Sequence, residues 1–192
     1  MALIKSALEL ALERTEGLTV DKEELRRKEL FTSGRVAVAK ALEDETLSFE
    51  VMVRDQEKAL KKTEFSVWAD GAMENLLSRI LLSSDPQAQA TFESVTALLD
   101  FLTHKKAGAT MQKLAQLLAQ YGTEVGQLKQ AIGQQLGAQL RQRAQQQGAN
   151  MSVWNLERDP GYLKVLAEHL EPLRAEYQQA LDQAKSEVKA LL

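Results

Sequence analysis

The hydrophobic pattern is clearest between Met111 and Gln147, where it predicts one long helix with two stripes. At about 100° per residue, a set of mostly large apolar side chains stays on one side of this helix. These are Leu114, Leu118, Tyr121, Val125, Leu128, Ile132, Leu136 and Leu140. A second set is small and falls within roughly 80° on the helical wheel: Ala115, Ala119, Gly122, Gly126, Gly133, Gly137, Ala144 and Gly148. The stripes are centred about 110° apart, so we expect two neighbours, one on each stripe.

The glycines inside this helix need a physical reason. Four interior glycines cost on the order of 3–4 kcal/mol relative to alanine. By analogy with small-residue faces of membrane helices, their missing side chains let a neighbouring backbone come close. The alternative is a helix that breaks near Gly122 or Gly133, which glycine tolerates. Alignment of the glycines on one face favours a continuous helix.

The last helix is predicted to fold back onto the long one. Asp159 and Pro160 form a cap-and-first-turn signal, and a heptad pattern follows, with Pro172 expected to kink or restart the helix. An antiparallel, coiled-coil-like hairpin is the natural arrangement. The predicted helix–helix interface consists of Ala115, Ala119, Gly122, Gly126, Gly133, Gly137, Leu114, Leu118, Tyr121, Val125, Leu128, Ile132, Leu163, Leu166, Leu170, Leu173 and Tyr177.

The pattern of hydrophobic and polar positions is less regular in the first half of the chain. Residues 3–16 are predicted to form an amphipathic helix that ends at Gly17. The charged segment after Asp21 has no clean apolar face, and an interruption is expected at Gly34. Residues 47–54 alternate apolar and polar positions, which is typical of a strand. A lone strand leaves its backbone groups unpaired, so a helix is slightly favoured and a short strand near 46–54 is the alternative.

Two further helices precede the long one. Residues 55–83 read as one helix in which Trp68 is a core or interface anchor. Asp85 and Pro86 mark the end of this helix and the start of the next one, which runs to about residue 105. The fold class is therefore all-α: a multi-helix bundle with a long hairpin in its C-terminal half. We expect an N-terminal helical region over 1–105 and the hairpin over 106–192, or one continuous domain.

The opening of the chain carries a family resemblance. The run IKSALELALERT, Ile4–Thr15, followed by the charged segment Asp21–Leu25, resembles small uncharacterised bacterial proteins with a similar opening. The resemblance covers about the first thirty residues and implies no activity and no site residues.

Composition narrows the function classes. The formal net charge is −3, so nucleic acid is not an expected partner. The absence of cysteine excludes disulfides, thiolate catalysis and Cys-ligated zinc, and suits the cytoplasm. No run approaches 18 apolar residues, so no transmembrane segment is expected. Charged residues interrupt the apolar opening, unlike a signal peptide.

No residue pattern predicts catalysis, a metal or a cofactor. His104 lies four residues after Asp100, and His169 lies beside Glu168, but neither pair has the further ligands that a metal site needs. We interpret both histidines as surface residues. Arg141 and Arg143 are expected to complement the negative C-terminal end of the long helix.

The pattern favours a structural or interaction protein that self-associates through its Leu and Gly/Ala helix faces. Its partner would be a second copy or another helical protein. One alternative is an amphipathic surface binder of lipid, granules or unfolded clients, motivated by the low charge of residues 107–140. A second alternative is a small-ligand carrier or enzyme with a pocket between helices.

Overall fold

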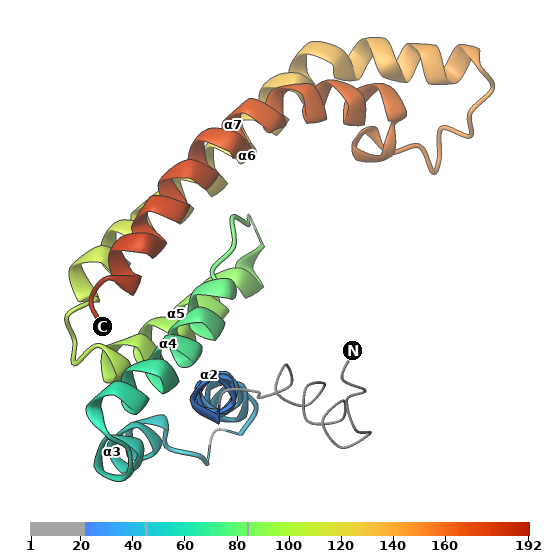
Figure 1. Ribbon diagram of the computed structural model, residues 1–192. Helices are drawn as coiled ribbons and strands as arrows, with labels where there is room; N and C mark the ends of the chain where they lie inside the picture. The colour runs from blue at the N-terminus through green and yellow to red at the C-terminus, as the bar shows by residue number, and fades with distance from the viewer. Residues whose placement is uncertain (1–21, 45, 84) are drawn as a thin grey trace, which may run out of the picture. The chain divides into compact units, whose positions relative to one another are not determined.

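The described residues of the computed structural model, 22–44, 46–83 and 85–192, are helical and contain no strand. The all-α prediction is therefore confirmed. The helix predicted at 3–16 lies outside the described residues, as does the family-like opening up to Asp21. In chain order the elements are α2 (Lys22–Glu43), α3 (Phe49–Ala59), α4 (Lys62–Ser78), α5 (Pro86–Leu102), α6 (Gly108–Gln146), the 3-10 helix η1 (Leu156–Arg158) and α7 (Pro160–Lys189), as Figure 1 shows.

The alternative of a strand near 46–54 is wrong, because this segment forms the start of α3. Ser48 caps the helix, its side chain accepting a hydrogen bond from the backbone N–H of Val51. Phe49 and Val53, four residues apart, are buried, while Val51 between them is half exposed. Helical spacing rather than alternation therefore decides which side chains pack.

The helix predicted over 55–83 is in fact two helices. Leu60 has an extended backbone, with φ −102° and ψ 150°, and it ends α3. The new helix has its own start signal: the backbone N–H of Lys61 donates to Glu64 Oε2 over 3.3 Å, as in one half of a capping box. The second helix, α4, ends at Ser78 rather than near residue 83.

The chain divides into two compact units, residues 1–75 and 76–192. The boundary predicted at 105/106 falls inside the second unit, between α5 and α6. In the first unit, α2 is continuous through Gly34, contrary to the predicted interruption. Trp68 is buried, as predicted for a core anchor, and its ring stacks with those of Phe49 and Phe65 at centroid distances of 6.4 and 5.8 Å.

Helices α2 and α4 cross with their backbones in direct contact at two glycines. A Cβ added to Gly34 would lie 2.0 Å from the carbonyl oxygen of Trp68, and one added to Gly71 would lie 2.0 Å from that of Phe31. No side chain fits at either position without moving a helix. The close backbone approach that we predicted for the long helix is thus found at this crossing.

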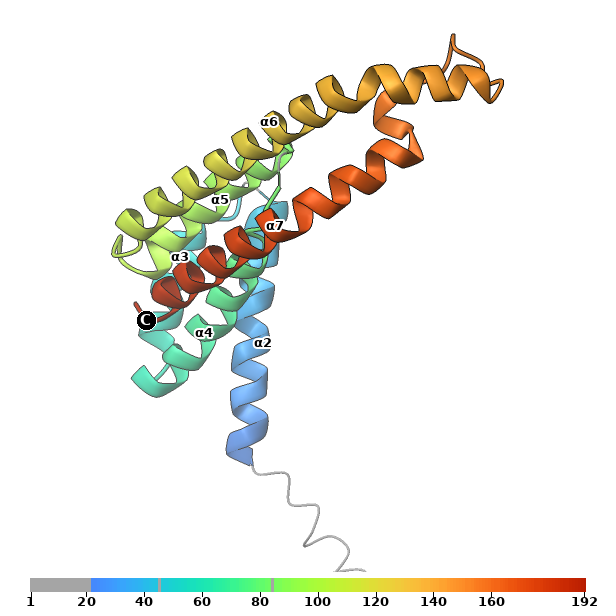
Figure 2. The same ribbon diagram turned by 90° about the horizontal axis from the view of Figure 1, so that it is seen from above.

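The second unit is built on α6 and α7, which run antiparallel and pack along their length (Figures 1 and 2). The helix α6 is a single helix of 39 residues, so the continuous reading through Gly122 and Gly133 is confirmed. The other helix, α7, is also continuous, and the restart predicted at Pro172 is wrong. Helix α5 packs on the N-terminal part of α6.

Candidate functional site

The large apolar stripe of α6 is largely occupied by α7. Tyr121 and Val125 pack with Tyr177, and Ile132 packs with Tyr162 and Leu166. Further predicted positions are buried or half-buried: Leu114, Leu118, Leu128, Leu170 and Leu173. This stripe therefore has an intramolecular neighbour along much of its length.

The heptad on α7 is shifted from its prediction. Leu163 is 48 % exposed, whereas Tyr162 and Leu181, which the predicted interface omitted, are buried. An α-helix drifts by about 20° per heptad from a strict 3.5-residue repeat. The buried stripe therefore turns away from the Leu163 position at one end and reaches Leu181 towards the other.

Two tyrosines of α7 make polar contacts with α6. The Tyr177 hydroxyl donates to Glu124 Oε1 over 2.7 Å, and Gln120 Nε2 donates to the same oxygen over 3.0 Å. Burial, together with the adjacent Glu124, raises the pKa of Tyr177 to about 12. The hydrogen bond from Tyr177, followed by that from Gln120, lowers the pKa of Glu124. The Tyr162 hydroxyl donates to the backbone carbonyl of Lys129 over 3.4 Å.

The small stripe of α6 has no helix pressed against it among the described residues. Ala115, Ala119 and Gly126 are exposed, and a Cβ added to Gly122 or Gly126 would meet nothing within 4 Å. Farther along, Cβ atoms at Gly133 and Gly137 would lie 3.7 and 3.4 Å from Leu156 Cδ2, a side chain of η1. The stripe is thus open at Gly122 and Gly126, contacted by Leu156 at Gly133 and Gly137, and buried at Ala144.

The open half of the small stripe forms one wall of a groove. The groove has a volume of about 390 Å³ and lies between α6 and the start of α5. Its apolar lining residues are Leu81, Ala88, Phe92, Ala115, Leu118, Ala119 and Gly122. Leu81 is 63 % exposed, although it is a large apolar residue. The polar lining residues are Ser83, Asp85, Gln89 and Glu93, so none of the described lining residues carries a positive charge.

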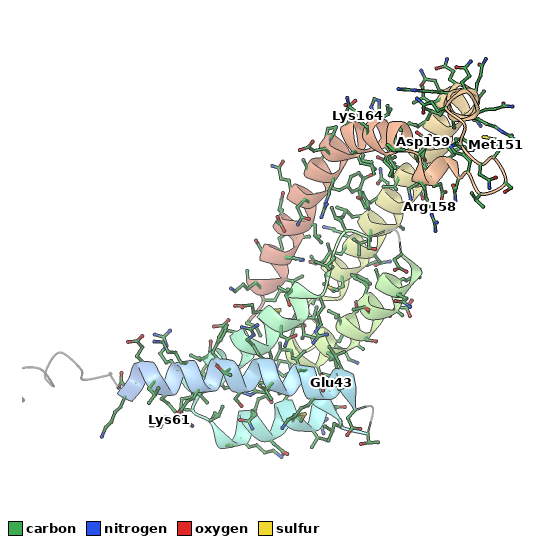
Figure 3. The ribbon with its side chains drawn as sticks, turned by 90° about the vertical axis from the view of Figure 1, so that its right-hand side faces the viewer. Glu43, Lys61, Met151, Arg158, Asp159 and Lys164 are labelled. Carbon is green, nitrogen blue, oxygen red and sulfur yellow. The ribbon has the colours of Figure 1, made fainter. Side chains whose placement is uncertain are left out.

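The far end of the α6–α7 hairpin has a small excess of positive charge, opposite in sign to that of the groove. Residues 125–156 contain no acid but three cations, Lys129, Arg141 and Arg143, and Arg158 follows on η1 between the acids Glu157 and Asp159. Figure 3 shows Met151, Arg158 and Asp159 where α6 turns back towards α7. In the same turn, Val153 is 76 % exposed. With three arginines against two acids over residues 141–159, the end of the hairpin has a net charge of +1 and an exposed apolar side chain.

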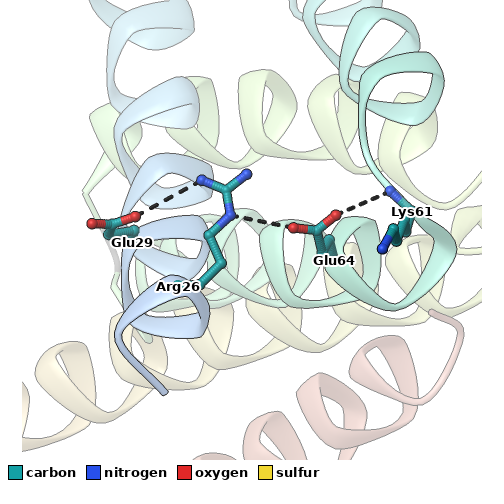
Figure 4. Close-up of polar contacts among 4 residues, drawn as sticks. All are labelled: Arg26, Glu29, Lys61 and Glu64. Carbon is teal, nitrogen blue, oxygen red and sulfur yellow. Dashed lines mark hydrogen bonds and ion pairs between the residues drawn. The ribbon is translucent and has the colours of Figure 1, made fainter. Parts of the chain in front are cut away.

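A second groove, in the first unit, is lined mostly by charged residues. It lies between the N-terminal parts of α2 and α4, and its lining includes Lys22, Arg26, Arg27, Lys61 and Lys62 as well as Glu23, Glu64 and Asp70. Figure 4 shows how Glu64 links this cluster: its Oε1 accepts from Arg26 Nε over 3.2 Å and its Oε2 from the backbone N–H of Lys61. Arg26 also pairs with Glu29. These internal pairs already neutralise part of the positive charge that an anionic ligand would need.

The two histidines lie in separate places. His104 is exposed in the turn between α5 and α6, with a φ of 51°, and one carboxylate oxygen of the nearby Asp100 is buried without a hydrogen-bond partner. His169 is exposed on α7. In the described part of the chain, no group of three or more potential ligands is placed to hold a metal ion. Within the same residues, no helix is both long and apolar enough to cross a membrane.

Comparison with known protein families gives one match, which covers most of the chain. The sequence model of a family of unknown function, DUF6657, matches residues 55–190. The chain belongs to this family. The DUF6657 match contains α4 to α7, and hence the α5–α6 groove and the far end of the hairpin, whereas α2 precedes it. No curated protein and no solved structure matches the chain.

Proposed function

We propose that this DUF6657 member is a helical interaction protein that self-associates, and that the groove between α5 and α6 is its docking surface. The observation that carries the proposal is the open apolar wall formed by Ala115, Ala119 and Gly122 opposite Phe92, with Leu81 exposed at its edge. Exposed apolar surface with a polar rim is typical of protein interaction sites. The large stripe of α6 is less suitable, because α7 already covers much of it.

The chemistry of the groove restricts its occupant. An apolar floor requires an apolar side chain, and the acidic rim residues Asp85 and Glu93 favour a positively charged neighbour. The chain itself supplies such a surface at the far end of its hairpin, which supports a second copy as the occupant. The volume of about 390 Å³ admits a few side chains rather than a whole helix, so we expect a small interface and weak, concentration-dependent association.

Sedimentation velocity over a series of protein concentrations tests this function. The weight-average sedimentation coefficient of the unchanged chain should rise with concentration. Ala115→Arg places a long charged side chain on the groove wall and should keep the chain monomeric. Gln116→Arg is the matched control, because Gln116 is exposed on the same helix and does not line the groove. A chain that stays monomeric at its highest soluble concentration would contradict the proposal.

A further inference from the structure

We propose that the copies associate head to tail: the far end of the α6–α7 hairpin of one copy enters the α5–α6 groove of the next. This inference rests on the proposed self-association and specifies its contact. Val153 is the apolar side chain that enters the groove, and Arg158 is the cation that pairs with Glu93 on the rim.

The first argument is chemical fit. The groove offers Leu81 and Phe92 to an apolar side chain, and its rim carries negative but no positive charge. Val153 is the most exposed large hydrophobic residue among the described residues, at 76 %. Three exposed arginines, Arg141, Arg143 and Arg158, lie within twelve residues of it in the sequence and outnumber the two acids of this segment. Complementary charge of this kind orients partners and speeds their encounter.

The second argument is that the end of the hairpin is held in shape before it meets a partner. Asn150 Oδ1 accepts hydrogen bonds from the backbone N–H and the hydroxyl of Ser152, at 3.1 and 2.7 Å. Trp154 Nε1 donates to Asp159 Oδ2 over 3.3 Å, which ties the turn to the N-cap residue of α7. A preorganised turn loses little conformational entropy on binding, so a small contact suffices for measurable affinity.

The third argument is distance. Gly122, on the groove wall, and Gln146, at the end of α6, belong to one continuous helix. At a rise of 1.5 Å per residue, they are separated by about 36 Å along that helix. The hairpin end therefore cannot reach the groove of its own chain, and the contact has to form between copies.

The symmetry of the assembly follows from these positions. Because groove and hairpin end are different patches, each copy that uses one of them leaves the other free. Such heterologous contacts produce a ring if the rotation closes and an open-ended chain if it does not. We expect association to continue beyond a dimer.

A charge-exchange experiment tests the contact. Glu93→Arg places a like charge opposite Arg158 of the neighbouring copy, and Arg158→Glu places a like charge opposite its Glu93. Since like charges facing each other are unfavourable by more than 1.4 kcal/mol, each variant alone should show an apparent Kd raised by about tenfold or more. An equimolar mixture should recover association, because the charges at positions 93 and 158 are then opposite wherever one variant meets the other.

The apolar part of the contact has its own test. Val153→Ser should weaken association, whereas Val36→Ser, at a half-exposed position on α2, should leave it unchanged. If the two charge variants associate like the unchanged chain, or their mixture fails to recover association, the head-to-tail contact is overturned.

Two further outcomes separate this contact from the broader function. Loss of association in Ala115→Arg but not in Val153→Ser or Arg158→Glu would overturn the head-to-tail contact and leave groove-mediated self-association standing. If Val153→Ser leaves association intact but abolishes retention of the chain on phosphatidylserine vesicles, the hairpin end is a lipid-binding surface and the contact is overturned.

Discussion

The crossing of α2 and α4 gives the sharpest test of the structure, through the substitution Gly34→Ala. In an open helix this change would stabilise the protein by about 1 kcal/mol, because alanine is the better helix former. Here the new Cβ would lie 2.0 Å from the carbonyl oxygen of Trp68 and 2.9 Å from the backbone nitrogen of Ala72. Ordinary van der Waals contact begins at 3.4 Å, so α2 has to move away from α4 by more than 1 Å.

The expected cost follows from this displacement. Extra volume in a well-packed core costs about 1–3 kcal/mol, and more when backbone has to move. We therefore expect Gly34→Ala to lower the free energy of unfolding by about 2 kcal/mol or more, in spite of its favourable helix propensity. Urea unfolding followed by far-ultraviolet circular dichroism measures the change.

Gly126→Ala is the matched control. Gly126 is exposed on α6, and a Cβ there would meet nothing within 4 Å. This variant should be more stable than the unchanged chain by about 0.5–1 kcal/mol. The reasoning is refuted if Gly34→Ala is as stable as the unchanged protein, or if both glycine variants change stability in the same direction.

Three further predictions concern the α6–α7 hairpin. In the folded state the pKa of Tyr177 is raised from 10.0 to about 12. The contribution of Tyr177 to stability is therefore complete below pH 10 and is lost as the pH rises towards 12. The free energy of unfolding, measured across this range, should fall. Pro172→Ala should raise the unfolding temperature, because a proline inside a helix costs about 3 kcal/mol relative to alanine and Pro172 is exposed in continuous α7. Asp159→Ala should lower the free energy of unfolding by about 1–2 kcal/mol, since Asp159 Oδ1 caps α7 through the backbone N–H of Gly161; equal stability in urea would contradict the role of this cap.

Local periodicity was sufficient to predict the helices of the second unit. The spacing of Leu114, Tyr121 and Val125 identified the face that meets α7, and Asp159 marked where α7 begins. These features depend on neighbours in sequence, which a helical wheel represents well. The break at Leu60 has neither glycine nor proline to announce it, so the sequence suggested one helix over 55–83 where there are two.

The glycines illustrate what the sequence could not predict, namely which of them contacts the backbone of another helix. Gly126 on α6 and Gly34 on α2 both lie inside helices, yet only Gly34 meets another backbone. Which glycine lies at a crossing depends on residues far away in the chain, here Trp68 on α4. The groove beside Phe92 was missed for the same reason, because it forms only when α5 packs on α6.

The two tyrosine contacts of α7 have a consequence for the alignment of the hairpin. Leucine stripes on two antiparallel helices remain compatible when one helix slides by a turn, since leucine then replaces leucine. The hydroxyls of Tyr177 and Tyr162 tolerate no such slide, because each needs a particular acceptor on α6, Glu124 and the carbonyl of Lys129. The phenols thus select one register of α7 on α6 among several of similar apolar packing.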